Sequence, residues 1–161
     1  MARLAERFEL TVDAAFTEAV NVRDVAGLLA AGNPRVAVRS TGAIPVASLN
    51  PPVARRILDE LVDNALRFSP PGSPVEIRIK RGPTRIEVRV VDRGPGIDEI
   101  DRERIFEPLE QAESLNARTH QGAGLGLSVA RTAARAMDGD VVLESSGPKG
   151  SIFLWTVALS R

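Results

Sequence analysis

The chain has 161 residues, enough for one domain with a hydrophobic core and, we expect, for no more than one. It carries 21 basic and 21 acidic side chains, so no bulk charge points to a nucleic acid or an anionic membrane as its partner. It contains no cysteine, which excludes disulfides and thiolate metal sites and is typical of a reducing compartment. No apolar run is long enough to span a membrane, and the N-terminus does not resemble a signal peptide. We therefore expect a cytoplasmic domain.

The first third of the chain contains several short apolar patterns separated by turn residues. A helical stripe of apolar side chains runs weakly through the N-terminal segment, and the later patterns alternate as strands do. The elements expected here are a helix over 1–11, a short strand over about 15–20, a helix capped by Asn21 that runs through Leu29 and stops at Gly32, and two strands at Val36–Val38 and Ile44–Val46.

The strongest pattern lies between Asn50 and Pro70. Apolar side chains recur there at three- and four-residue spacing, which predicts an amphipathic helix: Ile57, Leu58, Leu61, Val62, Ala65 and Phe68. Asn50 is suited to cap this helix, and the prolines after Ser69 end it. Glu60, Asn64 and Arg67 lie at i, i+4 and i+7, so they share one edge of the helix. A solvated face would account for these three residues by itself.

Two alternating segments follow, Val75–Ile79 and Ile86–Val90, and the turn Gly82-Pro83 between them predicts a hairpin. Each segment presents one buried and one wet face. The second segment leads into Asp92, at the start of the sequence D-x-G-x-G.

Asp92 in this position could accept a hydrogen bond from an exocyclic amine such as the 6-amino group of adenine. Gly94 and Gly96 would let the backbone approach a flat ring closely. An ordinary tight turn would also explain Gly94-Pro95-Gly96.

Residues 98–121 are polar and irregular. Within them, 105–108 reads Ile-Phe-Glu-Pro and is suited to anchor a loop through its apolar side chains. The segment 109–121 has few large apolar residues and is expected to stay exposed as a loop. His120, the only histidine, is interpreted as a solvated loop residue.

A second glycine motif, G-x-G-L-G-L at 122–127, runs into a helix expected over Leu125–Met137. Unpaired backbone amides at a helix N-terminus bind phosphate well. The motif lacks the lysine and hydroxyl residue that end a Walker loop. Closing strands are expected at Val141–Leu143 and Ile152–Val157, around a loop at 145–150. This order of elements favours an α/β sandwich (α+β), in which a mixed sheet is packed on one face by a layer of helices.

Together, the helix with Asn64, the turn at Asp92 and the glycine motif at 122–127 resemble the ATP-binding catalytic domain of sensor histidine kinases. That domain belongs to the superfamily of gyrase, the heat-shock chaperone and the mismatch-repair ATPase. The resemblance covers roughly residues 21–159 and implies a Bergerat-type ATP-binding fold. It divides the chain into 1–20, the tail of a dimerisation helix with an edge strand, and 21–161, the catalytic domain, with a mobile ATP lid at 109–121.

The resemblance also implies roles for individual residues. Asp92 would hold the adenine, supported by the hydroxyl of Ser151, and Asn64 would ligate a Mg²⁺ ion that bridges the phosphates. Glu60 stands where many of these kinases have asparagine, so it could be a general base or hold a metal-bound water. Arg67 replaces the commoner lysine and suits phosphate, and Phe68 replaces tyrosine and could pack on the adenine. The candidate catalytic residues are Glu60, Asn64 and Arg67, and the candidate cofactor-binding residues are Asn64, Phe68, Asp92, Gly94, Gly96, Ile97, Arg118, Gly122, Gly124, Leu125, Gly126, Leu127 and Ser151.

The function implied is that of a protein histidine kinase domain that uses ATP and Mg²⁺. It would donate the γ-phosphate to a histidine on a separate dimerisation domain of the same kinase, with a response regulator downstream. His120 lacks the acidic neighbour that a phosphoacceptor has in this family. Nucleic acid and direct membrane contact are not expected, and the domain is expected to be a monomeric fragment of a longer, cytoplasmic or membrane-tethered sensor.

Two alternatives remain open at this point. An anti-sigma-type serine kinase or another ATPase could use the same scaffold, and Glu60 leaves room for it. A pure interaction module that has lost nucleotide binding is the third possibility. The complete set of Asn64, Asp92 and the motif glycines argues against that module.

Overall fold

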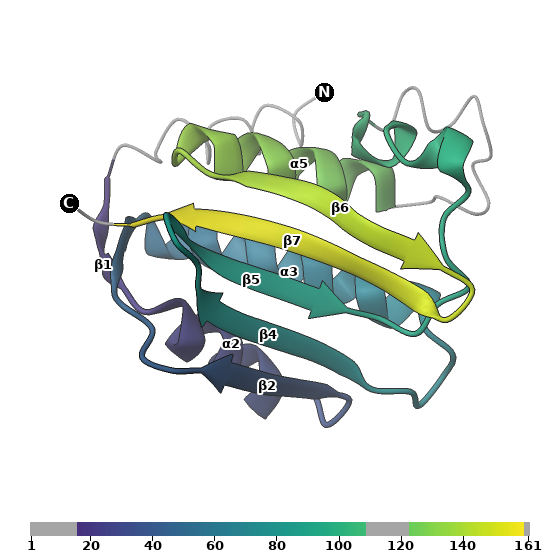
Figure 1. Cartoon of the computed structure of the whole chain (residues 1–161), viewed down its shortest axis with the longest axis horizontal. Helices are drawn as coiled ribbons and strands as arrows, with labels where there is room; N and C mark the ends of the chain where they lie inside the picture. The colour runs from purple at the N-terminus through teal and green to yellow at the C-terminus, as the bar shows by residue number, and fades with distance from the viewer. Residues whose placement is uncertain (1–15, 109–122, 160–161) are drawn as a thin grey trace.

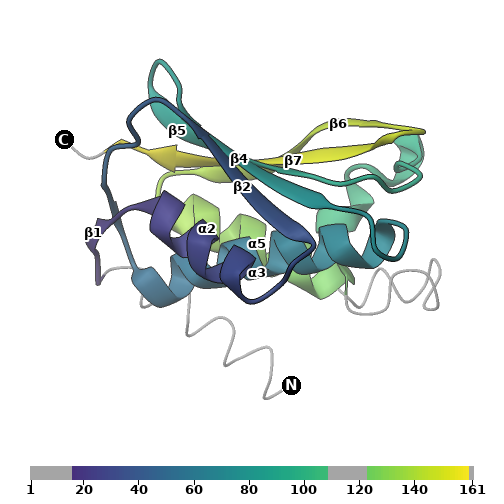
Figure 2. The ribbon, with the colours of Figure 1, turned by 90° about the horizontal axis from the view of Figure 1, so that it is seen from below.

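The computed structural model describes residues 16–108 and 123–159, which form two layers. One layer is a five-stranded mixed sheet of order β2-β4-β5-β7-β6, and a separate two-stranded sheet pairs β1 with β3. Figure 2 shows helices α2, α3 and α5 together on one side of the large sheet, and Figure 1 views the molecule from the other side. The expected α/β sandwich is confirmed.

Helices separate the strands, which occur singly or in consecutive pairs along the chain. In chain order they are β1 (Glu18–Val20), α2 (Val22–Ala31), β2 (Val36–Thr41), β3 (Ala47–Leu49), α3 (Pro51–Phe68), β4 (Val75–Arg81), β5 (Arg85–Val91), the 3-10 turns η2 (Glu99–Asp101) and η3 (Arg104–Phe106), α5 (Ala123–Ala136), β6 (Asp140–Gly147) and β7 (Gly150–Ala158). Only β2 and β4 pair in parallel within the large sheet, and all its other neighbours are antiparallel.

Helix α3 runs along the helical side of the sheet and forms as the sequence predicts. The Asn50 side chain caps it by accepting a hydrogen bond from the amide of Val53, at 3.1 Å. The apolar stripe is buried against the sheet, except that Phe68 at its end is half-buried. The helix ends at Ser69, whose extended backbone leads into Pro70.

The core lies between this helical layer and the inward face of the sheet. Alternate residues of β4, β5 and β7 are buried, which is the pattern of strands with one covered face. Trp155 and Phe153 of β7 are the largest fully buried side chains among the described residues. These contacts fix α3 over the central strands β4 and β5.

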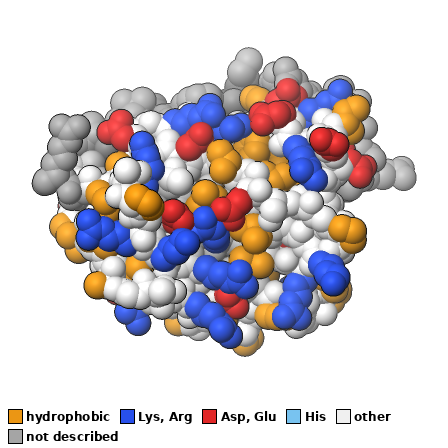
Figure 3. All heavy atoms as spheres, in the orientation of Figure 1, with side chains coloured by type: hydrophobic (Ala, Val, Ile, Leu, Met, Phe, Trp, Pro, Cys, Tyr) orange, Lys and Arg blue, Asp and Glu red, His pale blue; other side chains and the backbone are white. Residues whose placement is uncertain are grey.

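The opposite face of the large sheet carries ion pairs that run across the strands. Arg89 pairs with Glu87 and Glu144, each at 2.8 Å, and Lys80 lies 3.8 Å from Glu87. Figure 3 shows basic, acidic and apolar side chains mixed over this face. The pKa of Glu144 is lowered, mainly by its hydrogen bonds with Arg89. This face is a mixed-charge surface without one dominant sign.

The strand predicted at Ile44–Val46 is wrong. Strand β3 instead covers Ala47–Leu49, where Ala47 and Leu49 are buried and the backbone pairs with β1. Val46 is 50% exposed, and Pro45 has no amide hydrogen to donate to a ladder. The apolar pattern misplaced this strand because its pairing partner lies almost thirty residues earlier in the chain.

The closing hairpin is longer than predicted. Strands β6 and β7 extend to Gly147 and Gly150, so the loop expected at 145–150 is a turn of two residues, Pro148 and Lys149. A register shift between Leu143 and Ser145 marks a β-bulge in β6. Beyond the bulge, the Ser146 side chain contacts the turn that follows Asp92.

Several other predictions concern element boundaries. The helix after Asn21 is confirmed as α2, and the second long helix covers Ala123–Ala136 rather than Leu125–Met137. The expected helix at 1–11 and the lid at 109–121 lie outside the described residues. Among the helices described, none is long and apolar enough to cross a membrane.

Candidate functional site

The turn after β5 is built around the carboxylate of Asp92. Its Oδ1 accepts hydrogen bonds from the amide of Gly94 at 2.9 Å and from the amide of Ser151 at 3.0 Å. The Asp92 amide in turn donates to the carbonyl of Ser151 at 3.0 Å. Support for Asp92 thus comes from the backbone of Ser151. The Ser151 hydroxyl, expected in that role, instead pairs with Ser146.

The Asp92 side chain is buried, and this burial raises the pKa of its carboxyl. The hydrogen bonds from Gly94 and Ser151 act in the opposite direction, because they favour the charged form. Both bonds end on Oδ1, and Oδ2 has no hydrogen-bond partner in the described parts of the chain. One oxygen of a buried carboxylate is therefore left to accept a hydrogen bond.

The glycines of this turn are required by the protein's own packing. A Cβ on Gly94 would lie 2.8 Å from the carbonyl oxygen of Phe68, at the end of α3. Gly96 has a φ of +88°, and a Cβ there would lie 2.4 Å from the carbonyl oxygen of Gly147. The turn is thus fixed between the end of α3 and the end of β6.

Asn64 lies on α3 and is buried. Its Oδ1 has no hydrogen-bond partner among the described residues, which is unusual for a buried polar atom. An uncommitted amide oxygen of this kind can serve as one ligand of a hard cation. No cluster of three or more acidic or histidine side chains that could hold a metal occurs in the described ranges. A metal here would therefore need a ligand such as phosphate for most of its coordination.

Glu60 lies one turn before Asn64 and points toward α5. Its carboxylate pairs with Arg56 at 2.7 Å, and a Cβ on Gly126 would lie 2.2 Å from its Oε2. The Glu60 side chain therefore packs closely against α5 at Gly126 of the second motif. This contact brings the predicted acidic residue to the N-terminal part of the glycine-led helix.

Helix α3 consequently joins the two glycine motifs. Its middle contacts Gly126 through Glu60, and its last residue, Phe68, contacts Gly94. Arg67 is exposed on the same helix. The sequence predicted this grouping on three elements that are far apart in the chain.

Residues 50–161 match the family described as histidine kinase-, DNA gyrase B-, and HSP90-like ATPase. The match covers the three motifs and most of the chain. The chain belongs to this family. Membership supports the use of ATP, and together with the relatives described next it confirms the predicted resemblance to sensor histidine kinases.

Relatives of this ATPase domain are named as sensor kinases. The chain is 34% identical to the adaptive-response sensory kinase SasA of Synechococcus over 73% of its length, and 34% identical to the sensor-like histidine kinase SenX3 of Mycobacterium tuberculosis over 98%. It covers only 31% of the first relative and 37% of the second, so it spans about a third of their length.

Solved structures agree with this assignment. A full-length ShkA structure in complex with AMPPNP superposes with a TM-score of 0.73 at 26% identity, over 96% of this chain and 35% of that one. The mycobacterial sensor histidine kinase MprB superposes with a TM-score of 0.70 at 22% identity, over 89% of this chain and 97% of that one, and supports the fold.

Some candidate residues of the ATPase domain are not positioned as ligands by the structure. The side chain of Leu127 is buried in the core, and Ile97 is half-buried and packs against the core. Arg118 and Gly122 lie outside the described residues, together with His120. Gly124 and Leu125 lie within α5, whose backbone is described from Ala123.

The sequence did not single out three residues that hold the Asp92 turn. The Ser69 hydroxyl accepts a hydrogen bond from the amide of Arg93 at 3.1 Å. Ser146 contacts both Ile97 and Ser151, and Arg102 donates to the carbonyl of Ser146 at 3.1 Å. These residues carry no spacing pattern, because they come from three separate places in the chain, the end of α3, the end of η2 and β6, and only the tertiary structure brings them to the turn.

The segment that precedes the predicted lid is tied to α5 by an aromatic stack. The guanidinium of Arg131 lies 4.3 Å from the ring centroid of Phe106, a cation–π distance. The Phe106 ring packs edge-to-face on Phe153, with centroids 6.1 Å apart. Arg131 also lies 3.5 Å from the carboxylate of Asp140. The predicted apolar anchor at 105–108 therefore packs on both α5 and the sheet.

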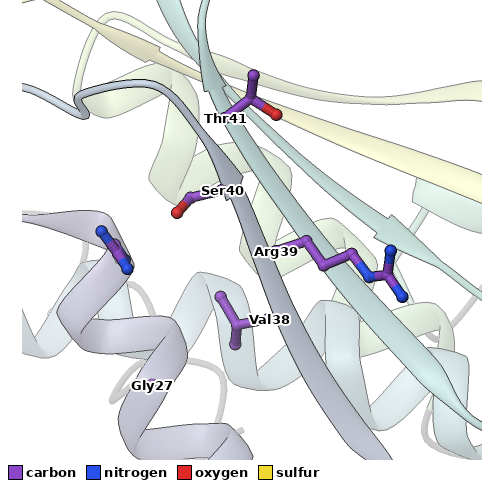
Figure 4. Close-up of a pocket in the computed structure, with 6 residues that line it drawn as sticks. Gly27, Val38, Arg39, Ser40 and Thr41 are labelled. Atoms are coloured by element: carbon purple, nitrogen blue, oxygen red, sulfur yellow. The ribbon is translucent and has the colours of Figure 1, made fainter.

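An open hollow of about 630 Å³ lies elsewhere, between α2 and the edge strand β2. Figure 4 shows Val38 and Ser40 on the side of β2 that faces α2, whereas the guanidinium of Arg39 points away. Arg39 lies 3.4 Å from Glu76 on the outer face of the sheet. None of the candidate residues of the ATPase site lines this hollow, so we assign it no part in nucleotide binding.

Proposed function

We propose that this domain binds Mg·ATP and donates the γ-phosphate to a histidine on a separate dimerisation domain of the same kinase. The observation that carries the proposal is the buried Asp92 carboxylate, with one oxygen fixed by backbone amides and the other uncommitted. The chain's family membership and its similarity to named sensor kinases support the same reaction.

Asp92 would select the base. Adenine presents an amine at its 6-position, which donates to a carboxylate oxygen, whereas guanine presents a carbonyl oxygen there. With guanine bound, the base's carbonyl oxygen and the Asp92 carboxylate oxygen would face each other, and neither can donate a hydrogen bond. Phe68 is half-buried at the end of α3 and in backbone contact with Gly94, so its ring could pack on the base.

Asn64 would hold Mg²⁺ through its amide oxygen. The uncommitted, buried Oδ1 fits a hard cation, and phosphate oxygens and water would supply the other ligands. When bound, the ion would neutralise charge on the phosphates. The backbone amides at the start of α5 would contact the phosphates as well, because a helix N-terminus presents unpaired donors.

Glu60 is the candidate general base. It would accept the proton of the attacking group, and Arg56 at 2.7 Å would hold its carboxylate in place. Gly126 leaves room for the carboxylate beside α5. The exposed Arg67 would stabilise phosphate charge. Catalysis would come from positioning and charge stabilisation, with no covalent intermediate on this domain.

The dimerisation domain would supply the phosphoacceptor, and a response regulator would receive the phosphoryl group from it. We place the domain in the cytoplasm, as a monomer when isolated, without direct membrane contact. The segment 109–121 is proposed as the ATP lid, and residues 1–20 as the end of the dimerisation helix with an edge strand.

A reconstitution experiment tests the proposal. The 161-residue chain alone should bind ATP by calorimetry but acquire no acid-labile phosphate. Adding the dimerisation domain of the same kinase should restore transfer to the histidine of that added domain. Acid-labile phosphate on His120 of the isolated chain would contradict this division of roles.

A further inference from the structure

We propose that Ser146 is a positioning residue that fixes the Asp92 turn and so sets the preference of the site for adenine. The inference rests on the proposed ATP-binding function. It concerns a serine that no motif contains and that lies 54 residues after Asp92 in the chain.

Ser146 joins both ends of the turn. Its hydroxyl accepts a hydrogen bond from the amide of Ile97 at 2.7 Å and lies 2.8 Å from the hydroxyl of Ser151. The amide of Ser151 holds Asp92 Oδ1 at 3.0 Å. The hydroxyl of Ser146 thus links the last residue of the turn to the strand residue that orients the carboxylate.

Arg102 contacts the same two residues, Ile97 and Ser146, through their backbone carbonyls. Its Nη2 donates to the Ser146 carbonyl at 3.1 Å, and its Nε donates to the Ile97 carbonyl at 3.4 Å. Ile97 is therefore held through both its amide and its carbonyl. Because Gly96 lies against the backbone of Gly147, the turn has contacts with β6 at two successive residues.

The β-bulge explains why Ser146, and not its neighbour, makes these contacts. A bulge places an extra residue in one strand and changes the direction of the side chains beyond it. The register shift lies between Leu143 and Ser145, directly before Ser146. Ser145 is exposed, whereas Ser146 is half-buried against the turn. The two adjacent serines therefore provide a variant and its matched control.

The experiment compares the affinities of the full chain for ADP and inosine diphosphate, which differ at the 6-position of the base. Ser146→Ala leaves the Ile97 amide without its acceptor and frees the turn, so ADP affinity should fall about 3- to 10-fold. Inosine diphosphate lacks the amine that uses Asp92, so its affinity should change less. Ser146→Thr keeps the hydroxyl and should restore ADP binding, and Ser145→Ala should bind as the wild type does.

Thermal unfolding of each variant separates positioning from loss of the fold. Arg102→Met, which removes the donors to the Ile97 and Ser146 carbonyls, should also lower the ratio of ADP to inosine diphosphate affinity. Equal ADP affinity in Ser146→Ala and wild type, or an equal loss for both nucleotides, would overturn the inference alone. A wild-type chain that does not bind ADP would overturn the proposed function as well.

Discussion

The two ends of the candidate site differ in how completely their polar groups are paired. At the Asp92 turn, backbone amides of Gly94, Ile97 and Ser151 all find side-chain acceptors. On helix α3, two buried polar atoms have no hydrogen-bond partner among the described residues, Asn64 Oδ1 and Arg56 Nε. At the base end the backbone amides are already paired and only Asp92 Oδ2 is left to accept a hydrogen bond, whereas the phosphate end contains buried groups that a charged ligand could pair.

This difference has a thermodynamic consequence. A buried polar atom without a partner costs about 1–3 kcal/mol, so the phosphate end lowers the stability of the free domain. A ligand that pairs such an atom recovers part of that free energy on binding. At the base end, ligand binding recovers less free energy in this way. The turn is already ordered, so binding costs little conformational entropy there, and its fixed acceptor can discriminate between bases. Each prediction below perturbs one end and compares the response with that of the other.

The largest expected effect is at Glu60. Replacing it with Gln keeps its size but removes the proton acceptor, so phosphoryl transfer should slow by about 10²–10⁴-fold while ATP affinity is retained. Asp59→Asn is the matched control, because Asp59 pairs with Arg55 at 3.3 Å one position earlier on α3. Transfer assays with the dimerisation domain measure both. A wild-type rate for Glu60→Gln would make Glu60 an ordinary helix-face residue.

At the base end, Asp92→Ala should weaken ADP binding roughly 10- to 100-fold, because the adenine amine and two protein amides lose their acceptor. Asp98→Ala, at an exposed position of the same segment, should bind ADP as the wild type does. Calorimetry with ADP checks both variants. Unchanged affinity in Asp92→Ala would remove Asp92 from the site.

The fold, and the position of the base end of the site, could be predicted from the sequence. The apolar stripe of α3 identified the buried helix, and the turn at Asp92 could be located because it directly follows an alternating strand. The position of β3 could not, because Ile44 and Val46 form a local apolar pattern while Ala47 and Leu49 make the tertiary contacts.

The support around the site was less predictable than its motifs. Ser146 reaches Ile97 only because of the bulge in β6, and the contact of Glu60 with Gly126 depends on how α3 packs on α5. Hydrogen bonds between residues far apart in the chain leave no spacing signal. The role of Ser151 shows this as well, because its amide rather than its hydroxyl holds Asp92.

The phosphate end makes a prediction about stability. Asn64→Leu replaces an unpaired buried amide with an apolar side chain of similar size, so the free energy of unfolding without nucleotide should stay equal or rise by about 1 kcal/mol. Asn50→Leu is the control, because Asn50 is also buried but caps α3, and its loss should destabilise the domain by about 1 kcal/mol. Urea unfolding distinguishes the two. Equal destabilisation would mean that Asn64 is paired in the free domain.

The smallest expected effect is on pH dependence. Burial raises the pKa of Asp92, so acidification should weaken ADP binding at a higher pH than an ordinary aspartate would. Because the folded-state pKa lies above the unfolded one, protonation of Asp92 favours the folded state as pH falls, so this group does not itself cause acid unfolding. Asp92→Asn should lack this component, because an amide does not titrate in this range. Titration of the nucleotide itself is common to both proteins, so the difference between them reports on Asp92. Calorimetry over a pH series, with circular dichroism to monitor folding, measures the difference.

The most direct test of the two-ended site is calorimetry of ADP with and without Mg²⁺ on the wild type, Asp92→Ala and Asn64→Ala, with Asp63→Ala as an exposed control next to Asn64. We predict that Asp92→Ala weakens binding equally in both conditions. Asn64→Ala should weaken binding roughly 5- to 30-fold with Mg²⁺ and little without it, because only the metal uses the amide oxygen. Equal losses for both variants in both conditions would contradict the division of the site into a base end and a metal-bearing phosphate end.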